Sequence, residues 1–150
     1  MVNESILNQL PNELFQLLAN IGYVGINKGF FAESQSIFES IVAACPENIF
    51  AQQALGIAYI FSRKITEGTK VLFNVLKKDP KNELCRSFLA IAFKMTKVDN
   101  EAIGASRSVV EHGKDPAAIQ IAKAILDSYE TLITPKELQA EQATKVSSVQ

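Results

Sequence analysis

Apolar residues recur at helical spacing in seven segments of this chain of 150 residues. Within each segment, apolar positions three or four residues apart would share one side of a helix, and each segment ends at proline, glycine or a polar cluster. The pattern therefore predicts an all-α protein without strands. The expected helices cover residues 12–27, 31–44, 48–62, 66–78, 82–96, 100–112 and 116–131.

The apolar pattern itself repeats along the chain. Pro46 and Pro80 each follow an apolar run, and Asn48 and Asn82 stand two residues after them. A proline after an apolar run ends a helix because it has no N–H to donate. The shift that places Pro46 on Pro80 also aligns three small residues at which paired helices could approach closely, namely Gly22, Gly56 and Ala90.

The pattern repeats about every 34 residues, and a proline follows the second helix of the unit. This resembles the tetratricopeptide repeat, a helix–turn–helix unit. The middle unit fits the pattern best, with residues of the expected kind at Leu55, Gly56, Tyr59, Gly68, Leu72 and Pro80. The resemblance implies an α-solenoid of three helical hairpins and a C-terminal capping helix, because a solenoid needs its last apolar face covered.

The expected domain organisation follows from the repeat. We expect a tetratricopeptide-repeat domain over residues 1–131 and a tail over residues 132–150, which is either frayed helix or disordered because it loses the apolar period. Within the domain, the repeats are expected at about 15–48, 49–82 and 83–115, with the capping helix at 116–131.

In such a stack, the first helix of each hairpin lines a concave inner wall. Its exposed positions are predicted to be largely apolar, at Tyr23, Ile26, Phe50, Ile57, Ile60, Phe61, Leu84, Ile91 and Met95. A separate apolar set is expected to pack between the helices, including Leu18, Ile21, Phe38, Ile41, Leu55, Tyr59, Leu72, Val75, Leu89, Phe93 and Val109.

A helix that is apolar on both its inner and its packing face must bury both. One interpretation is an open groove that binds an amphipathic helix through anchors at i, i+3 or i+4, and i+7. The other is that the inner-wall residues are core, or are covered by the chain's own tail or by a second copy. The apolar pattern alone leaves both interpretations open.

Charge and composition narrow the class of partner. Fifteen basic and sixteen acidic residues give a net charge of −1, so no electrostatic footprint for nucleic acid exists. The first residues lack a signal-peptide pattern, and no apolar run is long enough to span a membrane. We therefore expect a cytoplasmic protein in which Cys45 and Cys85 are free thiols.

Residues able to carry catalysis are scarce. The single histidine, His112, stands beside Gly113 at the end of a predicted helix, where the helix dipole favours it. No second histidine completes a metal pair, and Cys45 and Cys85 lack the spacing of a zinc site. The sequence therefore predicts no enzyme, no metal site and no cofactor.

The short chain of three repeats, the apolar inner wall and the run "LANIGYVGINKGFFAESQSIFESIVAACPENIFAQQALGIAYI" together resemble the small tetratricopeptide chaperones of bacterial type III secretion. Within that family the likeness is to the chaperone of the needle subunit, over residues 12–130. The resemblance implies a cytoplasmic chaperone that holds the amphipathic C-terminal helix of the needle subunit and prevents premature polymerisation. It also implies a second small helical chaperone as a partner.

Other functions remain open at this point. The chaperones of translocator proteins are similar in sequence pattern, and a general protein-interaction scaffold would have the same repeats. A homodimer whose groove holds its own N- or C-terminal segment is a further alternative.

Overall fold

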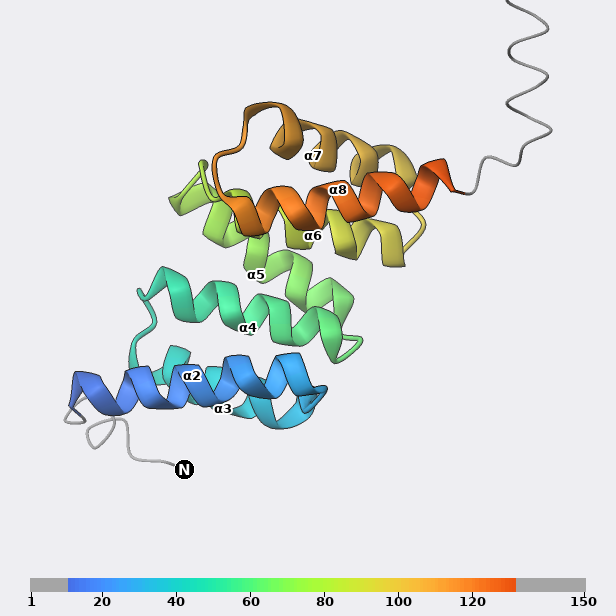
Figure 1. Cartoon of the computed structure of the whole chain (residues 1–150). Helices are drawn as coiled ribbons and strands as arrows, with labels where there is room; N and C mark the ends of the chain where they lie inside the picture. Colours follow the sequence, from blue (N-terminus) through green and yellow to red (C-terminus); the bar gives the residue numbers. More distant parts are fainter. Residues whose placement is uncertain (1–10, 132–150) are drawn as a thin grey trace, which may run out of the picture.

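The computed structural model describes residues 11–131, which form seven α-helices and no strand (Figure 1). The predicted all-α class of three helical hairpins and a final helix is confirmed. Residues 1–10 of the expected domain and the expected tail, 132–150, lie outside the described residues. Every helix end lies within one residue of its predicted position. The helices are α2 (Asn12–Lys28), α3 (Phe31–Ala44), α4 (Ile49–Phe61), α5 (Ile65–Lys78), α6 (Glu83–Met95), α7 (Asp99–His112) and α8 (Pro116–Glu130).

The turns inside the three hairpins share one backbone conformation. Gly29, Arg63 and Lys97 occupy equivalent positions of the repeat, and they alone among the described residues have positive φ angles, of 85°, 66° and 60°. In each turn the next residue donates its N–H to a carbonyl five residues back, as Phe30 does to Gly25 at 2.8 Å. The left-handed conformation is unfavourable at Arg63 and Lys97, which have a Cβ, so the repeat imposes this turn against local preference.

The helices that open the second and third hairpins are also capped alike. The Asn48 side chain accepts the N–H of Ala51 at 3.1 Å, and the Asn82 side chain accepts the N–H of Cys85 at 2.9 Å. Each cap satisfies one of the N–H groups that a helix start leaves without a partner. Proline and asparagine recur at the same spacing because α4 and α6 begin with the same kind of asparagine cap.

Two glycines lie where α4 crosses α5. A Cβ atom added at Gly56 would lie 2.7 Å from Cδ2 of Leu72, and one added at Gly68 would lie 2.7 Å from the carbonyl oxygen of Gly56. Both distances are too short for a real side chain, so the two glycines allow the two backbones to meet. The predicted role of Gly56 as a close-approach residue is confirmed.

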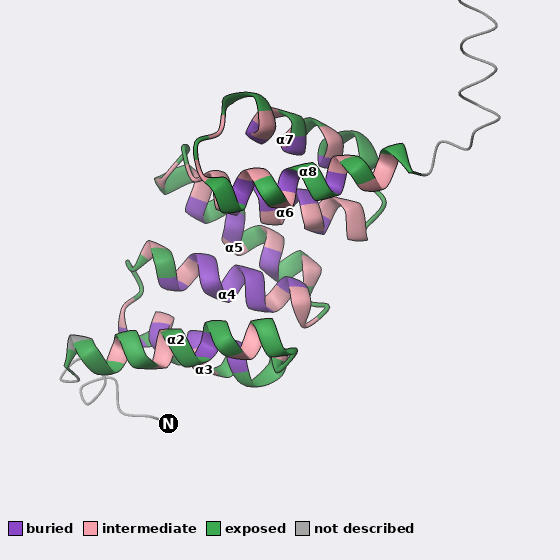
Figure 2. Cartoon of the chain, viewed as in Figure 1, coloured by how far each residue is buried: buried purple, intermediate pink, exposed green. Residues whose placement is uncertain are grey.

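The buried core follows the stack of helices (Figure 2). The α2–α3 and α7–α8 pairs lie at opposite ends of the stack, and α4 contacts α2, α3, α5 and α6 (Figure 1). One buried cluster joins α3 to α4, and a second joins α4, α5 and α6. Their members are Phe38, Ile41, Ala51, Ala54, Leu55 and Ala58 in the first cluster, and Ile57, Ile60, Leu72, Val75, Cys85, Leu89 and Ala92 in the second.

Candidate functional site

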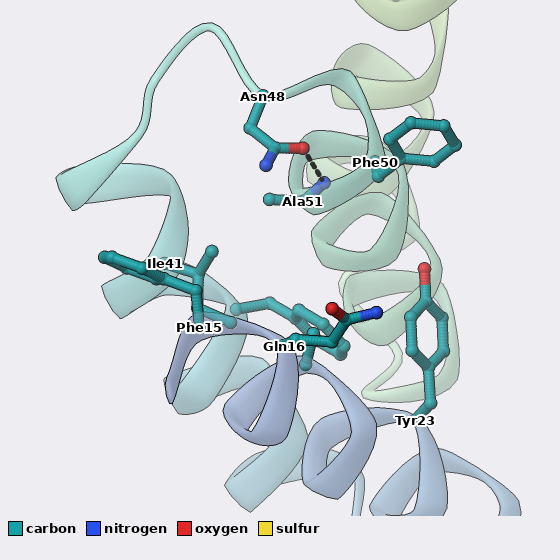
Figure 3. A pocket seen from close by; sticks show the side chains of 9 residues that line it. Phe15, Gln16, Tyr23, Ile41, Asn48, Phe50 and Ala51 are labelled. Carbon is teal, nitrogen blue, oxygen red and sulfur yellow. Dashed lines mark hydrogen bonds between the residues drawn. The ribbon is translucent and has the colours of Figure 1, made fainter. Parts of the chain in front are cut away.

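A groove opens between α2, α3 and the start of α4 (Figure 3). Its cavity of about 340 Å³ is lined mainly by apolar side chains, and polar atoms come chiefly from Gln16, Asn48 and the Tyr23 hydroxyl. This size and lining suit a few apolar anchors of a ligand, with the polar groups left to fix its orientation. The lining residues are Phe15, Gln16, Ala19, Tyr23, Phe38, Ile41, Asn48, Phe50 and Ala51.

Two aromatic residues stand at the edge of this groove. Phe50 is 77% exposed, and Tyr23 is 37% exposed. The Tyr23 ring meets the buried Phe38 ring edge to face, with centroids 5.2 Å apart, so the groove floor holds Tyr23 in position. The Asn48 cap fixes the first turn of α4 and thereby the place of Phe50 (Figure 3). An exposed phenylalanine held at the edge of an apolar cavity favours a binding role.

The Tyr23 hydroxyl is the polar group on this edge of the groove. Partial burial raises the pKa of Tyr23 above its ordinary value of 10.0. The phenol therefore stays protonated at physiological pH and is able to donate a hydrogen bond to a ligand. In Figure 3 the hydroxyl end of Tyr23 points toward the side on which Phe50 lies.

Phe50 also borders a second hollow of about 460 Å³ between the starts of α4, α6 and α8. This hollow is mostly polar, with Lys81 and Lys114 at its border. One carboxylate oxygen of Glu83 accepts the N–H groups of Lys114 and Asp115, both at 2.7 Å, and so ties the α7–α8 loop to α6. The wall thus changes from apolar beside α2 to polar beside α8, with Phe50 between the two parts.

The structure brings two of the nine predicted wall residues together at the groove edge, Tyr23 and Phe50. The prediction that Ile57 and Ile60 face an open groove is wrong, because they are 3% and 0% exposed. Both pack in the cluster between α4, α5 and α6. A helix that is covered by neighbours on several sides buries apolar residues that the repeat pattern alone assigns to the wall.

The other five predicted wall residues are half-buried. Four of them pack against the buried cluster that joins α4, α5 and α6, namely Ile26, Phe61, Ile91 and Met95. Leu84 packs against a third buried cluster, formed by Val109 of α7 with Ala118 and Ala122 of α8. Phe61 stacks on Phe31 with centroids 5.4 Å apart and meets Phe88 edge to face at 6.1 Å. These side chains serve packing in this structure, and a role for any of the nine residues in binding stays a prediction.

Phe15 is a groove residue that the sequence reasoning missed. It is half-buried and lines the cavity with Ala19 and Tyr23, which follow it at i+4 and i+8 on α2. This row of positions was a usable signal, since residues four apart lie on one side of a helix. Phe38 and Ile41, predicted as packing residues, are buried as expected and also form the groove floor.

Metal ions, membranes and thiol chemistry were the other possibilities to check among the described residues. They hold no group of three or more His, Cys, Asp or Glu side chains placed to bind a metal ion. Over the same residues, no helix is long and apolar enough to cross a membrane. Both cysteines are free, and burial, aided by the charge of Asp79, raises the pKa of the Cys85 thiol to about 12, which makes it a poor nucleophile.

Comparisons with known proteins identify a shared fold. No protein-family model matches the sequence, and no curated protein is significantly similar to it. Among solved structures, a chain of the CopN-Scc3 complex superimposes with a TM-score of 0.62 at 18% sequence identity. The match covers 79% of this chain and 71% of that chain. At this identity, the similarity shows that the two chains have the same helical architecture.

Proposed function

We propose that this protein is a chaperone of a type III secretion system that binds an amphipathic helix of a secreted client. The client helix occupies the groove between α2, α3 and α4, with apolar anchors placed against Tyr23 and Phe50. The proposed client is the needle subunit, which must be kept from polymerising in the cytoplasm before export. In this proposal the three hairpins are tetratricopeptide repeats.

One observation carries the proposal most directly. Phe50 is 77% exposed, yet its place is fixed by a capped helix start, and it stands at the edge of an apolar cavity. Large aromatic residues beside an apolar pocket are typical of interface hot spots, because they bury a large area on binding. A client side chain that fills the cavity beside Phe50 would be removed from water together with the Phe50 ring.

Two further points support the choice of client class. The sequence resembles type III secretion chaperones, and one structural neighbour is a chain of the CopN-Scc3 complex, in which it is bound to another protein. A polymerising helical subunit also has an apolar face that must be covered until assembly, and an apolar groove on a helical stack is suited to that task.

A binding measurement with paired variants tests the proposal. A labelled peptide of the needle subunit's C-terminal helix is titrated against the wild type, Phe50→Glu and the control Phe73→Glu. Phe73 is also exposed, at 45%, but lies on α5 away from the groove. We expect Phe50→Glu to weaken binding at least about 30-fold, as loss of a hot-spot residue does, and Phe73→Glu to leave it nearly unchanged.

The outcomes separate the alternatives. Equal binding by Phe50→Glu and wild type, with both folded by circular dichroism, would place the client away from this groove. Binding of a translocator-protein helix but not of the needle peptide would keep the chaperone function and change the client. If neither peptide binds the wild type, a general interaction scaffold is the better description.

A further inference from the structure

A hollow of about 360 Å³ between the start of α6 and the end of α7 concentrates positive charge. Lys81, Arg86 and Lys114 line it together with His112, and Glu83 is the only acidic residue of the lining. The chain as a whole has a net charge of −1, so this excess of positive charge is local. We call this site the basic hollow.

The cations of the basic hollow have no counter-charge within the described chain. Lys81, Arg86 and Lys114 form no ion pair with a carboxylate among residues 11–131. One oxygen of Glu83 already accepts two backbone N–H groups of the α7–α8 loop. Arg86 donates one N–H to the Pro80 carbonyl at 2.9 Å, which holds the guanidinium in place and leaves its other N–H groups available to a ligand. Like charges grouped in this way repel one another, and an anionic ligand relieves that repulsion.

The preceding repeat builds an equivalent hollow, which provides an internal comparison. It measures about 390 Å³ and lies between α3, α4 and α5. In both hollows one side chain donates a hydrogen bond to a proline carbonyl of the preceding loop, Gln52 to Pro46 in the first and Arg86 to Pro80 in the second. The two pairs are one repeat apart, so the two hollows occupy the same place in the repeat.

The two hollows differ in charge. In the first hollow, Lys78 at the end of α5 forms an ion pair at 3.0 Å with Glu47 of the α3–α4 loop. The equivalent positions in the basic hollow hold His112 and Lys81, so a base stands where the first hollow has its acid. The chain therefore supplies no carboxylate to the basic hollow at the place where the preceding repeat supplies one.

We propose that the basic hollow binds an acidic segment of a partner protein. Carboxylates of the segment meet Lys81, Arg86 and Lys114, because a carboxylate is bound most strongly by charge-assisted hydrogen bonds, above all from a guanidinium. Three cations around one hollow suit a segment with several Asp or Glu residues. Lys81 and Lys114 also border the hollow beside Phe50, so the basic surface continues along this edge of the stack.

The backbone around the basic hollow favours carboxylates over phosphate. Phosphate groups are commonly held by free backbone N–H groups at helix starts. Beside the basic hollow, such groups are bonded to the chain's own side chains. Asn82 caps α6, Glu83 accepts two N–H groups of the α7–α8 loop, and Asp115 accepts two from the first turn of α8. The cations that remain belong to three separate side chains, which suits carboxylates spaced along a segment better than one compact phosphate.

The charge of the ends of this chain points to a partner from another protein. Residues 132–150 contain two glutamates and two lysines, and residues 1–10 contain a single glutamate. Neither end concentrates negative charge, so neither matches the basic hollow. Charge complementarity therefore selects an acidic segment of a different chain.

A titration followed by amide NMR tests the proposal. The probe is a hexaglutamate peptide at about 0.15 M salt, with hexaserine as the uncharged control. We expect saturable shifts of the amide signals, confined to residues 80–86 and 108–115, with hexaglutamate and none with hexaserine. Raising the salt to about 0.5 M should weaken binding about tenfold, because exposed charges are screened.

A pair of variants with the same change of charge tests the site. Lys81→Glu should weaken hexaglutamate binding at least about tenfold, because an attractive contact becomes a repulsive one. Lys70→Glu changes an exposed residue of α5 outside the basic hollow and should bind within about twofold of the wild type. Lys81→Glu should also melt at or above the wild-type temperature, because it removes one of a group of like charges. A structural role for Lys81 would instead lower its melting temperature.

A double variant rebuilds the ion pair of the preceding repeat. Lys81→Glu with His112→Lys restores part of the net charge that the single variant loses, but it places a glutamate and a lysine at the positions of Glu47 and Lys78. Binding of hexaglutamate should therefore stay weak. Full recovery of wild-type binding would mean that overall charge attracts the peptide, and the proposed site would be wrong.

Four further results would overturn the proposal. The first is a folded wild type whose spectrum hexaglutamate does not change, and the second is equal weakening in Lys70→Glu and Lys81→Glu. The third is complete displacement of the peptide by inorganic phosphate at equal ionic strength, which would indicate a site for small anions. The fourth is a molar mass that rises with protein concentration in the wild type but not in Lys81→Glu, since a second copy would then be the occupant. The basic hollow shares no lining residue with the groove between α2, α3 and α4, so these results stand whether or not the needle peptide binds.

Discussion

The two helices at the ends of the described stack, α2 and α8, differ in the polarity of their outer surfaces. The outer side of α8 carries small or polar residues, so this helix ends the stack with a surface that water tolerates (Figure 2). The corresponding side of α2 carries four large apolar residues, which are Leu14, Leu17, Ile21 and Val24. A solenoid requires polar outer faces on its terminal units, and α8 meets that requirement while α2 does not. The exposed residues of α8 are Pro116, Ala117, Gln120, Lys123, Ala124, Asp127 and Glu130.

The two helices also differ in how they are held. Ser87 donates a hydrogen bond to the Ala118 carbonyl at 3.0 Å, and Tyr129 donates one to Asp99 at 2.7 Å. The Lys94 ammonium lies 3.9 Å from the centroid of the Tyr129 ring. No side chain of α2 is hydrogen-bonded to another helix among the described residues. Specific polar contacts thus fix α8, whereas apolar packing holds α2 against its neighbours.

The largest expected effect tests whether α8 has one core face and one solvent face. Ala122 is fully buried, and Ala124 on the same helix is exposed. Ala122→Asp would bury an unpaired charge and is expected to cost about 3–5 kcal/mol or to unfold the last hairpin. Ala124→Asp should change stability by less than about 0.5 kcal/mol. Thermal melts followed by circular dichroism check both, and equal melts would show that α8 does not close the core.

A smaller effect is expected at the cap of α8. The Asp115 side chain accepts the N–H groups of Ala117 and Ala118 at 2.9 and 3.4 Å. Asp115→Ala removes both bonds and should cost about 1 kcal/mol, measured by urea unfolding. Asp115→Asn is the matched control, because asparagine already caps α4 and α6. If the alanine variant is as stable as the wild type, the cap does not help to hold the end of the stack.

The smallest expected effect appears at high pH. Partial burial, together with the hydrogen bond to Asp99 and the charge of Asp99, raises the pKa of Tyr129 from 10.0 to about 12. The unfolded chain releases this proton near pH 10 and the folded chain only near pH 12, so the stability contribution is complete below pH 10 and is lost as pH rises from 10 to 12.

Replacement of the hydroxyl isolates this contribution. Tyr129→Phe should lower stability at pH 8 by less than about 1 kcal/mol, because the lost hydrogen bond is at the surface. Between pH 10 and 12 the variant should lose stability less steeply than the wild type. Denaturant unfolding at several pH values measures both slopes, and parallel slopes would contradict a role for this phenol in fixing α8.

The sequence alone predicted the features that depend on neighbours close along the chain. The helix ends were predictable because prolines, glycines and the asparagine caps act within a few residues. The place of Gly56 was predictable because the repeat aligned it with other small residues. The exposure of Tyr23 and Phe50 was also predicted correctly, since both lie on faces that the repeat directs away from the packing between helices.

Burial elsewhere was decided by the tertiary structure. Ile57 and Phe50 lie on one helix and both were predicted to line the wall, but α5 and α6 cover Ile57 and leave Phe50 at the edge of the stack. Ile21 and Leu55 are equivalent in the repeat, yet only Leu55 has a preceding helix packed against it. Periodicity specifies the direction in which a side chain points, because that is a property of the helix. Whether another helix lies in that direction depends on distant residues, and only the packed stack determines it.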